Sequence, residues 1–294
     1  MKEARLWTTA DDKVECQLCN HYCKIREGRK GLCQVRRNEA GRLYSLNYGK
    51  LIAAHIDPIE KKPLFHFLPG SRSYSIAASG CNFRCAWCQN WDISQLSDRN
   101  DPDRLALTTP EKVVGAALQS GCKSISYTYT EPTIFYEYAR DVSVLAREAG
   151  LRNVWVSNGY MSAEMLDEYM PLIDAINVDI KAFDDTVYRK YAGAHLQPIL
   201  DNCVTLKKAG VWLEVTTLLI PGVNDNEAQV VGLAEFVAEK LGTDTPWHVS
   251  RYYPQAQFRE IEATPAETIL NALKTGKDSG LQFVYTGNLG QHED

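Results

Sequence analysis

Three cysteines with the spacing Cys-x3-Cys-x2-Cys are the residues of this sequence best suited to chemistry: Cys81, Cys85 and Cys88. Three thiolates on one short loop can bind three irons of a [4Fe–4S] cluster, which leaves the fourth iron without a protein ligand. A closed structural zinc site needs a fourth Cys or His, and none follows Cys88 closely. The spacing therefore predicts an iron–sulfur cluster with one iron free to bind a small molecule.

A second group of cysteines lies nearer the N-terminus and can close a tetrahedron around one metal ion. Its members are Cys16, Cys19, Cys23 and Cys33. Gly28 and Gly31 let the intervening chain turn sharply, and His21 could replace one of the thiols. Structural Zn²⁺, a second iron–sulfur cluster and thiols without metal are three interpretations that the spacing leaves open. The two remaining cysteines, Cys122 and Cys203, are expected to be buried core thiols.

Predicted strands and helices alternate from about residue 71 onward. The three-cysteine loop directly follows the first of these strands. The strands are expected at 74–78, 124–127, 154–156, 175–179, 212–220, 247–250 and 282–285. The helices are expected at 110–120, 132–149, 162–173, 186–209, 227–241 and 265–274. Proline in the first turn and glycine after the last turn mark several of these helices. A strand–helix unit repeated about six times is typical of a parallel sheet flanked by helices.

Polar residues at the ends of these strands decide between a barrel and an open, doubly wound sheet. They are Cys81, Glu131, Ser157, Asn158, Asp179, Lys181, Thr217 and Arg251. They follow many successive strands, and a barrel gathers all such ends around one site. We therefore expect an α/β fold with a partial (β/α)6 TIM-type barrel over residues 71–294. A small Cys-rich, metal-binding subdomain, with a hairpin over 43–56, is expected to occupy residues 1–70.

Composition and charge limit the classes of partner. The 32 Lys and Arg residues and 37 Asp and Glu residues give a net charge of −5, so a nucleic-acid-binding surface is not expected. No apolar run approaches the roughly 18 residues of a membrane span, and residues 1–7 lack the apolar core of a secretory signal. We therefore expect a cytoplasmic protein with no membrane partner.

The sequence around the three cysteines resembles the radical S-adenosylmethionine (SAM) superfamily, and Trp87 and Asn90 match it as well. The resemblance implies that Glu131, at the end of the second strand, binds the SAM ammonium group together with backbone carbonyls. The superfamily often has Gly-Gly-Glu at this place, and this sequence keeps only the glutamate. The resemblance also implies that Ser157 and Asn158 face the methionyl part of SAM or its ribose.

The Asp-Ile-Lys sequence at the end of the fourth strand looks like the Asp-Leu-Lys motif of glycyl-radical activating enzymes. The resemblance implies that Asp179 and Lys181 lie in the SAM site, with Lys181 paired to the SAM carboxylate. The turn 220–225 resembles the turn after the fifth strand of the same enzymes. Two positions depart from their pattern: Val156 stands where they have Asp, and Thr216 stands where they tend to have Arg.

The closest resemblance runs nearly end to end and is to the AmmeMemoRadiSam-system radical SAM enzymes. It rests on the cysteine runs 16–23 and 81–90 and on the segments 62–67, 129–132 and 285–288. Members of this group are named for genomic association with a Memo-like protein and an AMMECR-type protein, which are therefore the expected system partners. The group is often described as homologous to pyruvate formate-lyase activating enzyme. The resemblance does not supply the substrate.

The resemblance implies an enzyme that reductively cleaves SAM. One electron from the reduced [4Fe–4S] cluster would break the C5′–S bond, and the 5′-deoxyadenosyl radical would take a hydrogen atom from a substrate. That substrate is unidentified, and a glycyl-radical-type protein is one candidate. The electron would come from a donor such as flavodoxin or ferredoxin. Trp87 would either stack on the adenine or cover the cluster from solvent.

The alternative function is a non-catalytic scaffold that binds an iron–sulfur cluster or zinc on a radical SAM-like barrel. The three cysteines, together with Glu131 and Lys181, favour the enzyme, because a site without activity needs none of them. A zinc hydrolase would need a His-rich ligand set. His66 and His248 are instead expected to be core or hydrogen-bonding histidines.

Overall fold

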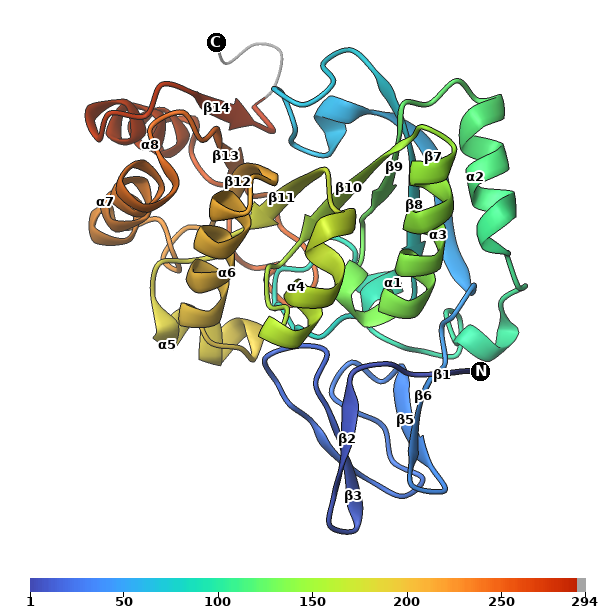
Figure 1. The fold of residues 1–294 in the computed structure, drawn as a ribbon. Helices are drawn as coiled ribbons and strands as arrows, with labels where there is room; N and C mark the ends of the chain where they lie inside the picture. Colours follow the sequence, from blue (N-terminus) through green and yellow to red (C-terminus); the bar gives the residue numbers. More distant parts are fainter. Residues whose placement is uncertain (290–294) are drawn as a thin grey trace.

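The computed structural model describes residues 1–289, which are built around one eight-stranded sheet (Figure 1). Its strands are β7 Leu51–Pro58, β8 Arg72–Ala78, β9 Ser124–Tyr127, β10 Arg152–Ser157, β11 Ala175–Asp179, β12 Trp212–Leu219, β13 Trp247–Arg251 and β14 Val284–Gly287. Their spatial order is β14-β13-β12-β11-β10-β9-β8-β7. Neighbours from β8 to β14 are parallel, and β7 is antiparallel to β8. Because β7 and β14 form the two edges, the barrel is open, and the predicted partial barrel is confirmed.

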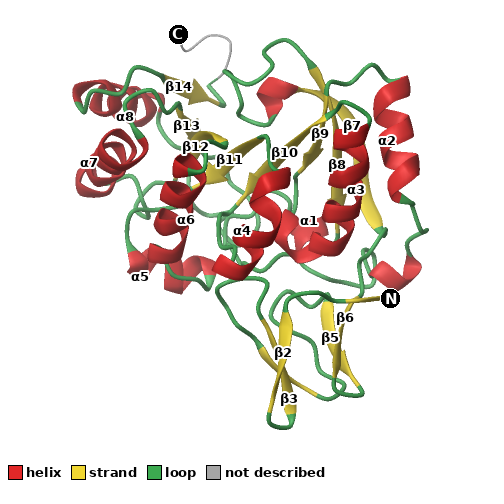
Figure 2. Cartoon of the chain, in the orientation of Figure 1, coloured by secondary structure: helices red, strands yellow, loops and turns green. Residues whose placement is uncertain are grey.

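Helices follow each of the six strands from β8 to β13 and cover the outer face of the sheet (Figure 2). The α-helices are α1 Trp91–Ser94, α2 Pro110–Gln119, α3 Tyr136–Glu148, α4 Ala163–Tyr169, α5 Asp185–Val187, α6 Gln197–Lys208, α7 Glu227–Phe236 and α8 Ala266–Asp278. Short 3-10 helices are η1 Ile59–Lys61, η2 Pro102–Arg104, η3 Pro132–Phe135 and η4 Met170–Leu172, and π-helical turns are η5 Tyr188–Ala192 and η6 Val237–Leu241. No helix of the described residues has the length and apolar character needed to cross a membrane.

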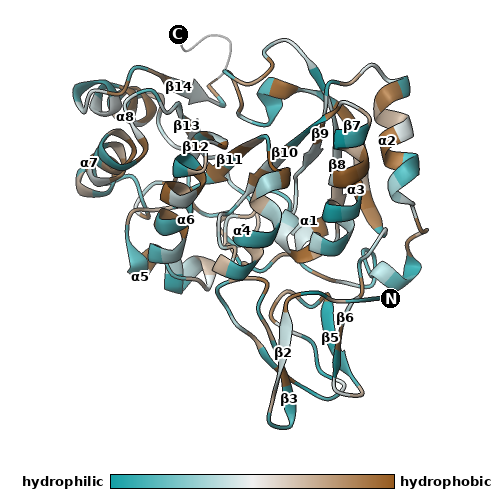
Figure 3. Ribbon diagram, in the orientation of Figure 1, coloured by the Kyte–Doolittle hydropathy of each residue, from teal (hydrophilic) through white to brown (hydrophobic). Residues whose placement is uncertain are grey.

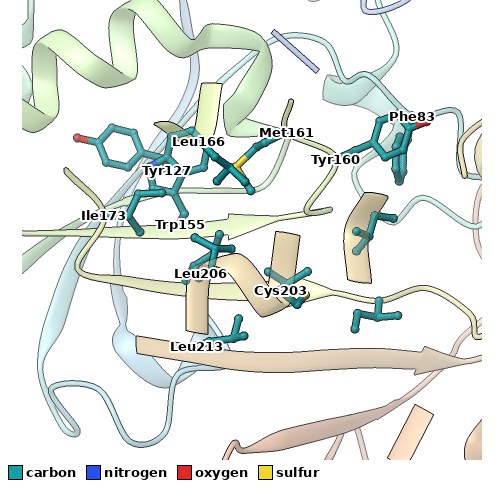
Figure 4. Close-up of a cluster of buried hydrophobic side chains, with 14 of the residues drawn as sticks. Phe83, Tyr127, Trp155, Tyr160, Met161, Leu166, Ile173, Cys203, Leu206 and Leu213 are labelled. Carbon is teal, nitrogen blue, oxygen red and sulfur yellow. The ribbon is translucent and has the colours of Figure 1, made fainter. Parts of the chain in front are cut away.

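The main hydrophobic core lies between the sheet and its helices. Several of these helices carry both hydrophobic and hydrophilic residues (Figure 3), as expected when one face rests on a sheet. Tyr127 and Trp155 belong to the same buried cluster as Leu206 and Cys203 of α6 (Figure 4). Cys203 is fully buried and Cys122 is 4% exposed, so the prediction of two buried core thiols is confirmed.

Residues 1–50 form a small lobe of two three-stranded sheets, which lies below the barrel in Figure 1. The strands are β1 Lys2–Glu3, β2 Trp7–Ala10, β3 Lys13–Cys16, β4 Lys24–Arg26, β5 Arg36–Glu39 and β6 Arg42–Ser45. The hairpin predicted over 43–56 is wrong. β6 pairs with β5 and β1, whereas β7 pairs with β8 of the main sheet. An alternating sequence identifies strands, but it does not identify their partners.

A buried ion pair attaches the lobe to the barrel. Arg36 Nη2 of β5 donates to both carboxylate oxygens of Glu137 of α3, at 2.7 and 2.6 Å. These side chains are 1% and 2% exposed. The loop between β3 and β4 adds a backbone bond from Asn20 N to the Tyr160 carbonyl, at 3.1 Å. Because an unpaired buried charge is very unfavourable, the ion pair strongly favours one placement of the lobe against α3.

The segment 59–68 closes the end of the barrel opposite the lobe (Figure 1). Ile59 and Leu64 pack against Val154 and Ala175 near the starts of β10 and β11. The segment therefore fills the end of the barrel at which the parallel strands begin. The opposite end, at which the strands finish, is left for the cysteine loop.

Glu214 of β12 is the fully buried anchor of this closing segment. Its carboxylate accepts hydrogen bonds from Phe65 N at 3.0 Å, His66 N at 2.9 Å, Trp212 Nε1 at 3.0 Å and His248 Nε2 at 2.6 Å. Burial by itself would raise the pKa of Glu214, but these donors more than offset it and the pKa is lowered. The imidazole of His248 bonds to Glu214 and that of His66 bonds to the Tyr285 hydroxyl at 2.7 Å, so both are hydrogen-bonding histidines, as predicted.

Glu214→Gln is expected to lower the free energy of unfolding by about 3 kcal/mol at neutral pH, because it weakens four buried hydrogen bonds to a charged acceptor. Urea denaturation measures this loss. The pKa of Glu214 is lower in the folded protein than its ordinary value of 4.5. The charged carboxylate therefore stabilises the fold above pH 4.5, and this stabilisation is lost as the pH falls through the folded-state pKa. The difference between wild type and variant should therefore shrink on acidification. A difference that stays constant down to about pH 3 would contradict this role of the charge.

Candidate active site

The three-cysteine loop, residues 79–90, connects β8 to the short helix α1. It is held against η5 by two backbone bonds. Arg84 N donates to the Ala192 carbonyl at 3.0 Å, and Ala86 N donates to the Tyr191 carbonyl at 3.0 Å. These bonds fix the middle of the loop, where the second cysteine lies.

The thiols of this loop line one cavity of about 480 Å³ inside the barrel. The same cavity is lined by every other residue that the sequence places in the SAM site. These are Trp87, Glu131, Ser157, Asn158, Asp179 and Lys181. They lie at or just beyond the carboxyl ends of β8 to β11 or on the loop itself. The structure thus brings the predicted cluster ligands and the predicted SAM residues to one place.

Burial controls the protonation of the thiols. It raises the pKa of Cys81 well above its ordinary value and that of Cys85 to about 12. Both thiols are therefore neutral near pH 7 unless a cation stabilises the thiolates. Metal binding supplies that stabilisation, because a coordinating thiol loses its proton.

Glu131 ties the end of β9 to the end of β10. Its Oε1 accepts hydrogen bonds from Thr133 N at 3.0 Å, Thr133 Oγ1 at 2.6 Å and Ser157 Oγ at 2.8 Å, and its Oε2 accepts one from Asn158 N at 2.8 Å. The residue is 2% exposed, and burial raises the pKa of its carboxyl group. Four donors on one buried carboxylate orient the Ser157–Asn158 turn toward the cavity.

Two asparagine side chains connect the cysteine loop to the strand ends. Asn158 Nδ2 donates to Asn82 Oδ1 at 2.8 Å, and Asn90 Nδ2 donates to the Tyr129 carbonyl at 2.8 Å. Tyr129 has a left-handed backbone with φ of 64°, which is strained for a residue with a side chain. Sequence reasoning missed Asn82, whose only signal is an amide side chain inside the cysteine run.

Lys181 and Asp179 form an ion pair in the cavity wall, with Nζ and Oδ2 2.6 Å apart. Burial lowers the pKa of Lys181, but the charge of Asp179 and the hydrogen bond to it outweigh this effect, so the pKa is raised. Asp179 Oδ1 and Thr216 Oγ1 are buried and have no hydrogen-bond partner among the described residues. The cavity wall therefore presents a cation beside the cysteine loop and two polar atoms that a ligand can satisfy.

Two of the predicted strand-end residues lie outside the cavity lining. Thr217 Oγ1 accepts a hydrogen bond from Trp247 Nε1 at 3.1 Å, and its neighbour Thr216 lines the cavity instead. Successive side chains of a strand point to opposite faces, so an error of one position exchanges the two faces. Arg251 Nε donates to the Thr264 carbonyl at 2.6 Å.

A polar group at the inner end of the cavity was not expected from the sequence. Lys62 Nζ donates to Asp57 Oδ2 at 2.6 Å and lies 4.5 Å from the centre of the Tyr129 ring. The Tyr129 hydroxyl donates to the same carboxylate oxygen. Lys62 therefore carries a buried, paired charge at the far end of the cavity from the cysteines.

The turn after β12 bonds to two residues that line the cavity, and the aromatic residue of the loop lines it directly. Asn224 Nδ2 donates to the carbonyls of Lys181 at 2.6 Å and Leu218 at 2.8 Å. Trp87 is 3% exposed, and its ring lies 6.2 Å from Tyr191 and 5.7 Å from Phe258 between centroids. The turn that resembled those of activating enzymes thus links the end of β11 to that of β12.

The class of protein follows from this open barrel and from the thiols at the end of its first parallel strand. Residues 75–234, more than half of the chain, match the family model of the radical SAM superfamily. The chain belongs to the radical SAM superfamily and is a radical SAM enzyme.

Its relatives include the protein MJ0808 of Methanocaldococcus jannaschii, which is 46% identical over 294 residues, covering 100% of this chain and 87% of that protein. The isethionate sulfite-lyase activating enzyme of Nitratidesulfovibrio vulgaris is 29% identical over 147 residues, 42% of this chain and 48% of that enzyme. Among solved structures, a radical SAM methyltransferase from Sphaerobacter thermophilus has a TM-score of 0.58 at 17% identity. That match covers 76% of this chain and 68% of the methyltransferase and shows the fold alone.

Membership of the superfamily implies a [4Fe–4S] cluster and SAM, and the described residues fit both. Three thiols facing one cavity supply the donor set for three irons. The unpartnered Asp179 Oδ1 and Thr216 Oγ1 suit a polar ligand with hydroxyl or ammonium groups. The cation of Lys181 suits a carboxylate.

Gly159→Ala is expected to weaken SAM binding roughly tenfold or more, because it displaces the Ser157–Asn158 turn. Gly159 has φ of +73°, and a Cβ there would lie 2.9 Å from Val178 Cγ1 and 3.1 Å from Ile199 Cγ2. Calorimetric titration of the cluster-loaded protein with SAM measures the effect.

Gly210→Ala is the matched control. Gly210 has a similar φ of +79°, but a Cβ there would meet nothing within 4 Å. This variant should lose some stability through backbone strain and keep wild-type affinity for SAM. Wild-type affinity in Gly159→Ala as well would show that the turn does not shape the SAM site.

Proposed function

We propose that the chain reductively cleaves SAM at a [4Fe–4S] cluster bound by Cys81, Cys85 and Cys88, for hydrogen abstraction from a substrate. The observation that carries this proposal is the single cavity that the three thiols share with Lys181 and Glu131. When bound, the cluster supplies the electron that breaks the C5′–S bond of SAM, which yields methionine and a 5′-deoxyadenosyl radical. The protein's part is to orient SAM and to exclude water.

The proposed role of Lys181 is to bind the SAM carboxylate. Lys181 lines the same cavity as the thiols of Cys81, Cys85 and Cys88, so it lies near the cluster position. Asp179 is proposed to hold Lys181 through its Oδ2 atom and to bond to SAM through its free Oδ1 atom. Thr216 would contribute its hydroxyl group to the same ligand. In activating enzymes the position of Thr216 tends to carry Arg, which this chain lacks there, so Lys181 is the proposed cationic partner of the SAM carboxylate.

Glu131 is proposed to act mainly as a positioning residue for Ser157 and Asn158, which would contact the methionyl part or the ribose of SAM. Its Oε2 atom accepts one described bond, from Asn158 N, and a carboxylate oxygen can accept a second. That remaining site is available for the SAM ammonium group. For Trp87, the two hypotheses of stacking on the adenine and covering the cluster stay predictions.

The substrate is proposed to be a protein in which a glycyl radical is formed. A relative in Methanocaldococcus jannaschii that is described as a putative glycyl-radical enzyme activating enzyme, 22% identical over 219 residues, supports this class of substrate. Residues 61–63 line the cavity and belong to the segment that packs against the starts of β10 and β11, so the substrate is proposed to enter at the opposite rim, where the strands end. Memo-like and AMMECR-type proteins are proposed as system partners from the sequence resemblance.

Wild-type protein reconstituted anaerobically with iron and sulfide is expected to form 5′-deoxyadenosine from SAM and dithionite. Cys85→Ala should abolish this product, because the cluster loses one of three ligands. Chromatographic quantification of 5′-deoxyadenosine measures the reaction.

The control for this experiment is Cys122→Ala, which removes a thiol far from the loop in sequence and outside the cavity lining. It should keep both the cluster and the product. A well-formed cluster that gives no product and no spectroscopic change on addition of SAM would favour the non-catalytic scaffold and refute the proposed function.

The electron donor is proposed to bind on the outer side of the cysteine loop. A second cavity, of about 240 Å³, is lined by Arg84, Cys85, Trp91, Gln95, Ala256, Gln257 and Arg259. Cys85 lines both cavities, so this surface is close to the cluster position. Two arginines beside the 44% exposed Trp91 favour a flavodoxin or ferredoxin that presents an acidic face.

Arg259→Glu is expected to slow reduction of the cluster by such a donor roughly tenfold at low salt, because charge reversal weakens the encounter. Stopped-flow absorbance measures this rate, and the effect should shrink as salt screens the charges. Reduction by dithionite should stay unchanged. Lys112→Glu, on α2, makes the same charge change elsewhere and should have little effect. Equal slowing by both variants would place the donor elsewhere.

A further inference from the structure

The four N-terminal cysteines surround one small cavity within the lobe. Cys16 ends β3, Cys19 and Cys23 lie before β4, and Cys33 lies before β5. All four line a cavity of about 10 Å³, whose other walls are largely apolar. Backbone bonds from Cys16 N to the Cys23 carbonyl at 3.0 Å and from Tyr22 N to the Cys19 carbonyl at 3.0 Å bring the first three together. All four are free cysteines.

A buried arginine on the same cavity gives an independent sign of a negatively charged group. Arg36 is 1% exposed and lines the cavity. Its Nη2 atom bonds to Glu137, but its Nε and Nη1 atoms have no hydrogen-bond partner within residues 1–289. Buried N–H groups without an acceptor are costly, and thiolate sulfurs beside them would satisfy both. Neutral thiols are much weaker acceptors.

The dimensions of the cavity favour a single ion over a second cluster. About 10 Å³ is close to the space that one water molecule needs. The cavity beside the other three cysteines is about 480 Å³. A set of four thiolates suits Zn²⁺.

Within residues 1–289, no group of three or more His, Cys, Asp or Glu side chains, in either cysteine group, already stands in the arrangement that holds a metal ion. The proposed binding therefore includes a rearrangement of the four side chains, for which staggered rotamers about the Cα–Cβ bond are available.

We propose that Cys16, Cys19, Cys23 and Cys33 bind one structural Zn²⁺ ion, and that this ion fixes the lobe against the back of the three-cysteine loop. Small antiparallel sheets with little core of their own commonly need a metal to fold stably. Zinc would supply that stability, and Arg36 would offset part of the negative charge of the four thiolates.

The contacts of the lobe explain why this ion would matter for the other site. His21 Nε2, in the turn after Cys19, donates to the Asn82 carbonyl at 2.9 Å. Gly80 approaches the lobe so closely that a Cβ there would lie 3.1 Å from the Cys33 carbonyl oxygen. The two turns that carry zinc ligands therefore rest directly on the loop that carries the predicted cluster ligands.

Metal analysis of anaerobically purified protein, without added metal, tests the proposal. Wild type should contain about one zinc ion per chain, and the double variant Cys19→Ser/Cys33→Ser should contain none. Cys85→Ala should keep the zinc while it loses the iron–sulfur cluster. The double variant should also become sensitive to proteolysis within residues 1–50.

A second measurement tests the same proposal if the double variant does not fold. Cys85→Ala protein, treated with a chelator and then with Co²⁺, should show the absorption of cobalt in a tetrahedral set of four thiolates. Zinc-free wild type would overturn the proposal. If Cys85→Ala still contains about four iron and four sulfide ions per chain, the zinc proposal is wrong and the four cysteines bind a second cluster. Rapid alkylation of all four thiols in native protein would overturn it in favour of bare thiols.

Discussion

The rest of the site depends on one constraint. Three thiols must be held close together on a loop that has almost no regular structure. A free loop of this length would lose much conformational entropy on ordering. Backbone bonds to η5 hold its middle, while the amides of Asn158 and Asn90 join it to the ends of two strands. Neutral amides suit this task, because they bond to the loop without adding charge beside the thiols.

Much of the fold was predictable, because its signals are local. Proline at the start of helices and glycine after them define the helices, and runs of Val, Ile and aromatic residues define the strands. Once the strands are parallel, the residues that follow them must share one end of the barrel. Glu131, Asp179 and Lys181 could therefore be assigned to the site from their positions alone. The assignment failed where a shift of one residue changes the face, as with Thr217 and Thr216.

The contacts that could not be predicted join residues far apart in the sequence. Glu214 bonds to Phe65, 149 residues away, and Arg36 bonds to Glu137, 101 residues away. No periodic pattern identifies such partners. The same reason explains the wrong hairpin over 43–56, since the true partner of β7 is β8, across the closing segment. These pairs determine how the lobe and the closing segment sit on the barrel.

The edges of the eight-stranded sheet give the barrel a mechanical property that a closed barrel lacks. In a closed barrel, strand number and shear together fix the diameter. Here β7 and β14 are the two ends of the spatial order, so the radius can adjust through small changes in twist between neighbouring strands. A change in radius of this kind would let the same barrel close around ligands of different width while every pair of neighbouring strands stays hydrogen-bonded.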